Sequence, residues 1–123
     1  GADEPGRITS ANSIQENEAI FDIAPASFVD LEPIIMNAGT ILWNGPLGFF
    51  EKENFFAGTA MIAKMIISSK GFSVAGGGDT ISAAEKAGVL DSLDYVSTAG
   101  GAFLEFMEGK KLPALEALID KVN

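Results

Sequence analysis

Five consecutive residues form the stretch best suited to chemistry, since three glycines run directly into an aspartate and a threonine. They follow an apolar run and open a segment with helical spacing. A helix N-terminus offers unpaired N–H groups and a partial positive charge to an anion. Glycines let a phosphate approach those N–H groups without meeting a Cβ atom. Asp79 would be an oxygen ligand of a Mg²⁺ ion shared with the phosphates, and Thr80 a further hydroxyl donor. The stretch predicts a phosphate site formed by Gly76, Gly77, Gly78, Asp79 and Thr80.

The same stretch also fits a purely structural interpretation. The glycines would form a tight turn and Asp79 would be the N-cap of the helix, a common position for aspartate. Taken alone, the stretch leaves both interpretations open.

Two further loops combine glycine with polar residues after an apolar run. "STAGGAFLE", residues 97–105, repeats the order of strand, small-residue loop and helix, and two such helix starts at one sheet edge suit a polyphosphate or a moving phosphoryl group. An ordinary turn capped by Ser97 or Thr98 is the alternative. In "WNGPLGFFE", residues 43–51, the carboxylate of Glu51 is suited to the two hydroxyls of a ribose. A solvated glutamate ahead of a helix is the alternative there.

The elements that position these loops alternate between strand and helix. Apolar runs predict strands at residues 40–43, 72–75 and 95–97, with a further short strand at residues 19–23. Strands that are apolar along their length, separated by helices, indicate a parallel sheet covered on both faces. The predicted fold is therefore α/β, a partial doubly wound (Rossmann-like) sheet of three or four strands. Ligands of such sheets bind beyond the carboxyl ends of the strands, where all three loops would lie.

Helix boundaries follow from capping signals. One helix is expected to end near Asn37, with Ser27 as its N-cap and Pro33 kinking or splitting it. Asn54 is the expected N-cap of a helix over residues 55–69, and Asp79 that of a short helix ending before Gly88. Two more helices are expected, at residues 102–108 and from residue 113 onward.

Length, composition and charge limit the classes of function that the protein can have. Length predicts one domain, residues 19–123, preceded by a polar, aperiodic segment, residues 1–18, that reads as a loose lead-in or the cut edge of an expressed piece. The net charge of −9 argues against a nucleic-acid or anionic-membrane partner. The sequence has neither cysteine nor histidine, which excludes disulfides and any Ser-His or Cys-His mechanism within it. With no leader and no apolar run of about 20 residues, we expect a soluble, cytoplasmic protein.

Cations are scarce where a phosphoryl transfer would need them. The single arginine, Arg7, lies in the lead-in, and no lysine lies in the three glycine loops. Transfer needs positive groups to neutralise charge on the moving phosphoryl. The loops would therefore bind a nucleotide but form a poor catalyst by themselves.

The three loops in this order resemble phosphoglycerate kinase. The stretches that carry the resemblance are "LWNGPLGFFE", "AGGGDT" and "STAGGAFLEFMEGKKLP", with "DIAP" at residues 22–25 as a further family segment. The similarity runs from about residue 14 to the carboxyl end and covers the last third or so of that enzyme, inside its nucleotide-binding domain.

The resemblance implies reversible transfer of a phosphoryl group between 1,3-bisphosphoglycerate and ADP, forming 3-phosphoglycerate and ATP, with Mg²⁺. It implies that residues 77–80 contact the nucleotide phosphates, Asp79 through Mg²⁺. It further implies that Glu51 holds the ribose, that Asn44 and Pro46 line the nucleotide site, and that Gly100 and Gly101 face the transferring phosphoryl group.

Departures from the family pattern concern single residues and whole regions. Ala99 replaces the usual glycine, Ala24 stands where glycine is usual, and Pro33 lies in a helix that normally lacks it. The substrate-binding domain and the segment with the catalytic lysine are not in this sequence. We therefore expect an inactive fragment of the kinase with a weakened nucleotide site, which self-associates through an exposed sheet edge or by domain swapping. The alternatives are a free-standing, non-catalytic nucleotide- or phosphate-binding module and a structural domain whose glycine loops are only turns.

Overall fold

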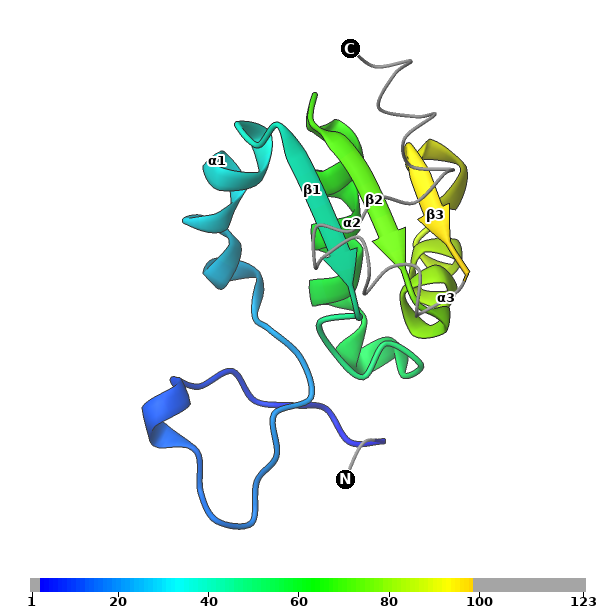
Figure 1. Cartoon of the computed structure of the whole chain (residues 1–123). Helices are drawn as coiled ribbons and strands as arrows, with labels where there is room; N and C mark the ends of the chain where they lie inside the picture. Colours follow the sequence, from blue (N-terminus) through cyan, green and yellow to red (C-terminus); the bar gives the residue numbers. More distant parts are fainter. Residues whose placement is uncertain (1–2, 99–123) are drawn as a thin grey trace.

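A sheet of three parallel strands is the centre of the structure, a computed structural model that describes residues 3–98 (Figure 1). The strands are β1 (Thr40–Asn44), β2 (Phe72–Gly76) and β3 (Tyr95–Ser97), in the order β1-β2-β3. They match the three predicted strands to within one residue. Parallel strands that alternate with helices confirm the predicted α/β class.

Burial along the strands explains their composition. In the central strand β2, Val74 and Ala75 are almost fully buried, as expected for a strand covered on both faces. The edge strand β1 alternates instead, because Trp43 is 5% exposed and Leu42 is 43% exposed. β3 is aligned to β2 by Asp94, whose carboxylate accepts hydrogen bonds from the Ser73 N–H at 2.8 Å and the Ser73 hydroxyl at 3.0 Å.

Helices α2 (Ala57–Ser68) and α3 (Gly78–Lys86) lie behind the sheet in Figure 1, and α1 (Leu31–Met36) lies beside β1. A short 3-10 helix, η4 (Leu90–Ser92), connects α3 to β3. A single apolar core joins these helices to the sheet; its buried members are Phe28, Ile35, Trp43, Phe50, Ile62, Ala63, Ile66, Ala75, Ala83, Ala84, Val89 and Leu93. The helices predicted at residues 102–108 and from residue 113 lie outside the described residues, so a second helical layer stays a prediction.

The prediction of a strand at residues 19–23 is wrong. Within the described chain this segment is irregular and lies against the loop that follows β1, where the Phe49 N–H donates to the Phe21 carbonyl at 2.7 Å. The neighbouring Asp22 turns its carboxylate to α2 and accepts the Gly58 N–H at 2.9 Å. A single backbone hydrogen bond does not form a strand ladder, so the apolar residues here pack as a loop.

The helix predicted to end near Asn37 is divided, as expected from Pro33. Its two parts are the 3-10 helix η2 (Pro25–Phe28) and α1. Pro33 occupies the third position of α1, where an N–H would have no partner within the helix. The prediction of Ser27 as N-cap is wrong, because Ser27 lies inside η2.

Two other capping predictions are also wrong. Asn54 belongs to a separate 3-10 helix, η3 (Glu53–Phe55), and α2 begins after it without a side-chain cap from its own N-cap residue. α3 begins with Gly77 as N-cap, so Asp79 lies within the first turn. A distant carboxylate and a glycine backbone therefore replace the local caps suggested by the sequence.

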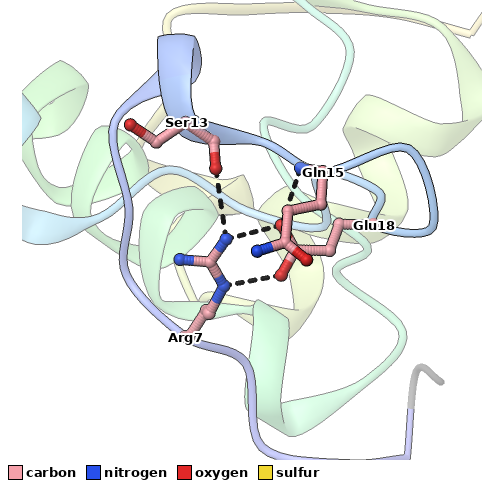
Figure 2. Close-up of polar contacts among 4 residues, drawn as sticks. All are labelled: Arg7, Ser13, Gln15 and Glu18. Carbon is pink, nitrogen blue, oxygen red and sulfur yellow. Dashed lines mark hydrogen bonds and ion pairs between the residues drawn. The ribbon is translucent and has the colours of Figure 1, made fainter.

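Residues 7–18, near the amino end of the described chain, are held by Arg7 and Glu18 (Figure 2). The Arg7 guanidinium donates to both carboxylate oxygens of Glu18, at 2.6 and 2.5 Å, and to the Ser13 carbonyl at 3.2 Å. The Gln15 N–H donates to the same carboxylate at 3.0 Å. Hydrogen bonds from Arg7 and Gln15 lower the pKa of Glu18 to about 2. These contacts close a loop that contains the 3-10 helix η1 (Ala11–Ser13).

Candidate functional site

The carboxyl ends of the three strands form one row. Asn44 pairs with Gly76 in the register of β1 and β2, and Gly76 pairs with Ser97 in that of β2 and β3. The loops that follow these residues include all three glycine loops identified in the sequence. Their predicted meeting at one sheet edge is confirmed for the parts that the structure describes.

Gly77, in the candidate phosphate site, has a backbone conformation that other residues rarely adopt. Its φ of +93° lies in the region that favours glycine. Its N–H donates to the Ser97 carbonyl at 3.3 Å, and a Cβ built on it would lie 3.5 Å from Asn44 Oδ1. The backbone angle, rather than a lack of space, requires glycine here. The bend sets the direction of α3 and brings residues of all three loops together.

The first turn of α3 leaves room for a ligand among the described residues. A Cβ built on Gly78 would meet no atom of residues 3–98 within 4 Å. Asp79 is exposed and lies in the first turn of α3, two positions after the N-cap Gly77. An exposed aspartate beside this space, at a helix N-terminus, can serve a cation bound together with an anion.

Thr80 differs from its neighbours because it is buried. It is 1% exposed, and its Oγ1 accepts the Gly45 N–H at 2.6 Å. A hydroxyl can accept one hydrogen bond and donate another. Thr80 therefore joins the loop after β2 to the loop after β1, a contact that its predicted role as a phosphate ligand did not include.

The loop after β1 is held through its backbone. Trp43 Nε1 donates to the Gly45 carbonyl at 2.9 Å. Thr59, in the first turn of α2 and fully buried, accepts the Leu47 N–H at 3.2 Å and the Gly48 N–H at 3.4 Å. A loop whose N–H and C=O groups are satisfied by fixed side chains is pre-organised before any ligand arrives.

Asp22 closes the same region from the other side. A Cβ on Gly48 would lie 2.5 Å from Asp22 Oδ1 and 2.5 Å from the Phe55 carbonyl oxygen, and one on Gly58 would lie 2.3 Å from Asp22 Oδ1. The two glycines thus provide the space that the carboxylate occupies. At the N-terminus of α2 its negative charge is also favourable.

The other predicted ligands fall at the rim of this region. Asn44 ends β1 and is exposed, Pro46 is half-buried in the loop, and Glu51 is exposed in the turn that follows. The structure brings Asn44 close to Gly77, but no described contact joins Glu51 to the first turn of α3. Gly100 and Gly101 lie outside the described residues.

Sequence reasoning missed four residues that hold this edge, namely Asp22, Trp43, Thr59 and Lys86. The family stretch "DIAP" is the only signal that pointed toward Asp22, and Trp43 lies in the family stretch "LWNGPLGFFE" without an assigned contact. Thr59 and Lys86 carried no signal, because each bonds a backbone group that is 11 to 36 positions away in the sequence.

The described residues offer neither a metal site complete in itself nor a membrane span. Residues 3–98 contain no group of three or more side chains placed to hold a metal ion by themselves. Over the same residues, no helix is long and apolar enough to cross a membrane.

Comparisons with known proteins agree on one family. A model of the phosphoglycerate kinase family matches residues 2–110. A phosphoglycerate kinase of Vibrio campbellii (strain ATCC BAA-1116) is 54% identical over 111 residues, which cover 90% of this chain and 29% of that protein. The structure of phosphoglycerate kinase from Coxiella burnetii matches with a TM-score of 0.75 and 48% identity, over 85% of this chain and 27% of that one. The enzyme from Pyrococcus horikoshii OT3 matches with a TM-score of 0.65 and 42% identity, over 81% and 24%. The chain thus spans less than a third of each of these relatives.

Proposed function

Because the chain belongs to the phosphoglycerate kinase family, we propose that it forms the nucleotide edge of a site that transfers a phosphoryl group between 1,3-bisphosphoglycerate and ADP. The products in that direction are 3-phosphoglycerate and ATP. The observation that carries this proposal is the row of strand ends, Asn44, Gly76 and Ser97, with the first turn of α3 beside it, which is open among residues 3–98. A sheet edge of this kind is where doubly wound folds bind nucleotides.

The phosphates of ADP or ATP would lie at the N-terminus of α3, against the backbone of residues 76–78. Thr80 is buried and accepts the Gly45 N–H, so its hydroxyl would contact them only if the loop after β1 moved. Mg²⁺ usually keeps several waters and takes one or two carboxylates plus substrate phosphates. A single exposed Asp79 fits that ligand set, and the absence of a three-ligand metal group within residues 3–98 is compatible with it. When bound, the metal neutralises charge on the phosphates.

Glu51 would accept hydrogen bonds from the ribose hydroxyls, with Asn44 and Pro46 lining the nucleotide. These roles rest on the family stretches and on the position of all three residues at the carboxyl edge of β1. Gly100 and Gly101 would face the transferring phosphoryl group, by the same family pattern.

Transfer itself would need groups from elsewhere in the protein. In the described part of the chain, Arg7 is paired with Glu18, Lys52 with Asp3, and the Lys86 ammonium with the Phe50 carbonyl. Lys64 lies in the second half of α2 and Lys70 just before the amino end of β2. We propose that a substrate-binding domain and a catalytic lysine complete the site, and that this chain alone binds nucleotide without turnover. A free-standing binding module remains the second candidate, which a natural reading frame starting near residue 1 would favour.

The family is glycolytic, and we propose a cytoplasmic location for this member. We also propose that the isolated chain self-associates. Within residues 3–98, no strand pairs with the outer edge of β1, which leaves a row of backbone donors and acceptors open to a second copy.

The test of the nucleotide site is a titration of the labelled 123-residue chain with ADP and Mg²⁺, followed by NMR amide shifts. We expect shifts at residues 76–80 and near Glu51. Asp79→Ala should weaken Mg-ADP binding by about tenfold, which corresponds to a loss of about 1.4 kcal/mol, and should remove most of the Mg²⁺ dependence. Asp91→Ala is the matched control, because Asp91 is an exposed aspartate on η4. No shifts at millimolar ADP, or equal binding by the Asp79 variant, would overturn the proposed site.

A further inference from the structure

One helix holds both ends of the loop after β1. Near its start, Thr80 Oγ1 accepts the Gly45 N–H at 2.6 Å. At its last residue, Lys86 Nζ donates to the Phe50 carbonyl at 2.7 Å, across 36 positions of sequence. The helix whose N-terminus faces the proposed phosphate site therefore also fixes the backbone immediately before Glu51.

The Lys86 ammonium is surrounded by one short segment. Besides the Phe50 carbonyl, it contacts Glu53 Oε1 at 2.9 Å and lies 4.5 Å from the centroid of the Phe56 ring. All three partners belong to residues 50–56, the segment that carries Glu51. Of these contacts, the one to the Phe50 carbonyl is a hydrogen bond, the one to Glu53 an ion pair and the one to Phe56 a cation–π contact.

The contacts differ in how firmly they hold the segment. The Glu53 side chain is 82% exposed, so its ion pair with Lys86 is screened by water. The Phe50 carbonyl and the Phe56 ring are better protected, since Phe50 is buried and Phe56 is half-buried. A hydrogen bond from a charged donor to a protected carbonyl is the stronger kind. The bond to Phe50 is therefore the firmest of the three Lys86 contacts, and it adds to the Lys52 N–H bond to the Phe49 carbonyl (3.0 Å), which closes the turn around Glu51.

We propose that Lys86 is a positioning residue that fixes the Glu51 carboxylate relative to the phosphate end of α3, so that ribose and phosphates are bound in one geometry. The inference rests on the proposed nucleotide site. Lys86 acts through the backbone and does not itself touch the ligand. Without the ammonium, α3 and its first turn would remain, and Phe50 would stay in the core, but the backbone at Phe50 would lose its hydrogen bond to α3.

The test compares ADP with 2′,3′-dideoxy-ADP, which lacks both ribose hydroxyls. The wild-type chain should bind Mg-ADP more tightly than the dideoxy nucleotide. Lys86→Met keeps the aliphatic stem and removes the donors. It should weaken Mg-ADP binding by about threefold to tenfold, in line with the loss of a hydrogen bond to a charged group, and leave dideoxy binding unchanged. Lys64→Met, an exposed lysine on α2, should retain the full preference for ADP.

A second measurement needs no ligand. In Lys86→Met the amide signal of Glu51 should shift, and amide exchange at residues 50–53 should speed up, while signals at residues 76–80 stay in place. An unchanged Glu51 signal would overturn the inference even if nucleotide binds. Equal weakening of ADP and dideoxy-ADP would also overturn it, since that result indicates general destabilisation.

The two proposals fail in different ways. If wild type binds no ADP, the proposed nucleotide site is wrong, while a shifted Glu51 signal would still support the link from Lys86 to Glu51. If Lys86→Met does not fold, Lys86→Gln makes the same comparison, because its shorter amide falls short of the Phe50 carbonyl.

Discussion

Two threonine hydroxyls hold the loop after β1, and both threonines are buried. Thr59 is fully buried and accepts two loop N–H groups, and Thr80 is 1% exposed and accepts a third. Each threonine lies in the first turn of a helix, where a side-chain oxygen often bonds the helix's own N–H groups. Here both oxygens bond the loop. At the residue scale, the buried hydroxyl oxygens of Thr59 and Thr80 fix backbone N–H groups of the loop after β1 and so pre-organise the candidate site.

Thr80→Val tests this arrangement, since valine has nearly the same shape but no acceptor. The Gly45 N–H would lose its partner in a half-buried position, which costs about 1–3 kcal/mol of the free energy of unfolding. Urea unfolding of the chain measures the loss. Thr80→Ser should keep most of the stability, and the exposed Thr40→Val should stay within about 0.5 kcal/mol of wild type. A Thr80→Val chain as stable as wild type would show that this hydrogen bond does not hold the loop.

At the scale of elements, the start of α2, the loop after β1 and the segment around Asp22 meet without room for a further atom. The carboxylate bonds the N-terminus of α2 at Gly58 and is flanked by Gly48. The irregular segment before α1 is thus part of the scaffold of the candidate site. Its apolar residues predicted a strand because composition does not reveal a carboxylate that binds a distant helix.

Gly48→Ala would crowd this junction. The new Cβ would lie 2.5 Å from the Phe55 carbonyl oxygen, a backbone atom that cannot swing aside. We expect a loss of about 1–3 kcal/mol in the free energy of unfolding, the range for overpacked positions. Gly39→Ala is the matched control, because a Cβ built there would meet no atom of residues 3–98 within 4 Å. Thermal unfolding of both variants measures the difference, and equal stabilities would contradict the close approach seen here.

At the scale of the whole molecule, the unpaired edge of β1 favours association of two copies, and the net negative charge opposes it. The outer edge of β1 has no partner strand within residues 3–98, which favours pairing with a second copy. The net charge of −9 repels such a copy. Salt shortens the screening length from about 10 Å at about 0.1 M to about 3 Å at about 1 M, so it should shift the balance toward association.

Sedimentation velocity of the chain over a range of concentrations and salt should therefore show dimers that increase with ionic strength. Leu42→Glu, on β1, should reduce the dimer far more than Val29→Glu. Both replace an exposed apolar residue and add the same charge, but Val29 lies off the edge. A clean monomer at high concentration and high salt would exclude self-association through this edge.

The strands and their common edge could be predicted from the sequence. Residues 40–43, 72–75 and 95–97 form largely apolar runs, each with one serine or threonine, separated by helical segments, and a parallel sheet is the fold that buries such runs. Once the strands are parallel, the glycine loops after them must meet at the carboxyl edge. The letters of residues 76–80 also predicted that a helix starts at one of these strand ends.

Only the tertiary structure decided what holds that edge together. Asn54 and Asp79 look like caps, yet α2 receives Asp22 from 36 positions away and α3 starts at a glycine with positive φ. Lys86 likewise bonds a carbonyl 36 residues earlier. A local pattern reports the period and the turns of the chain. It cannot report which distant polar group lies nearest to a helix end or a loop carbonyl, because folding brings those groups together.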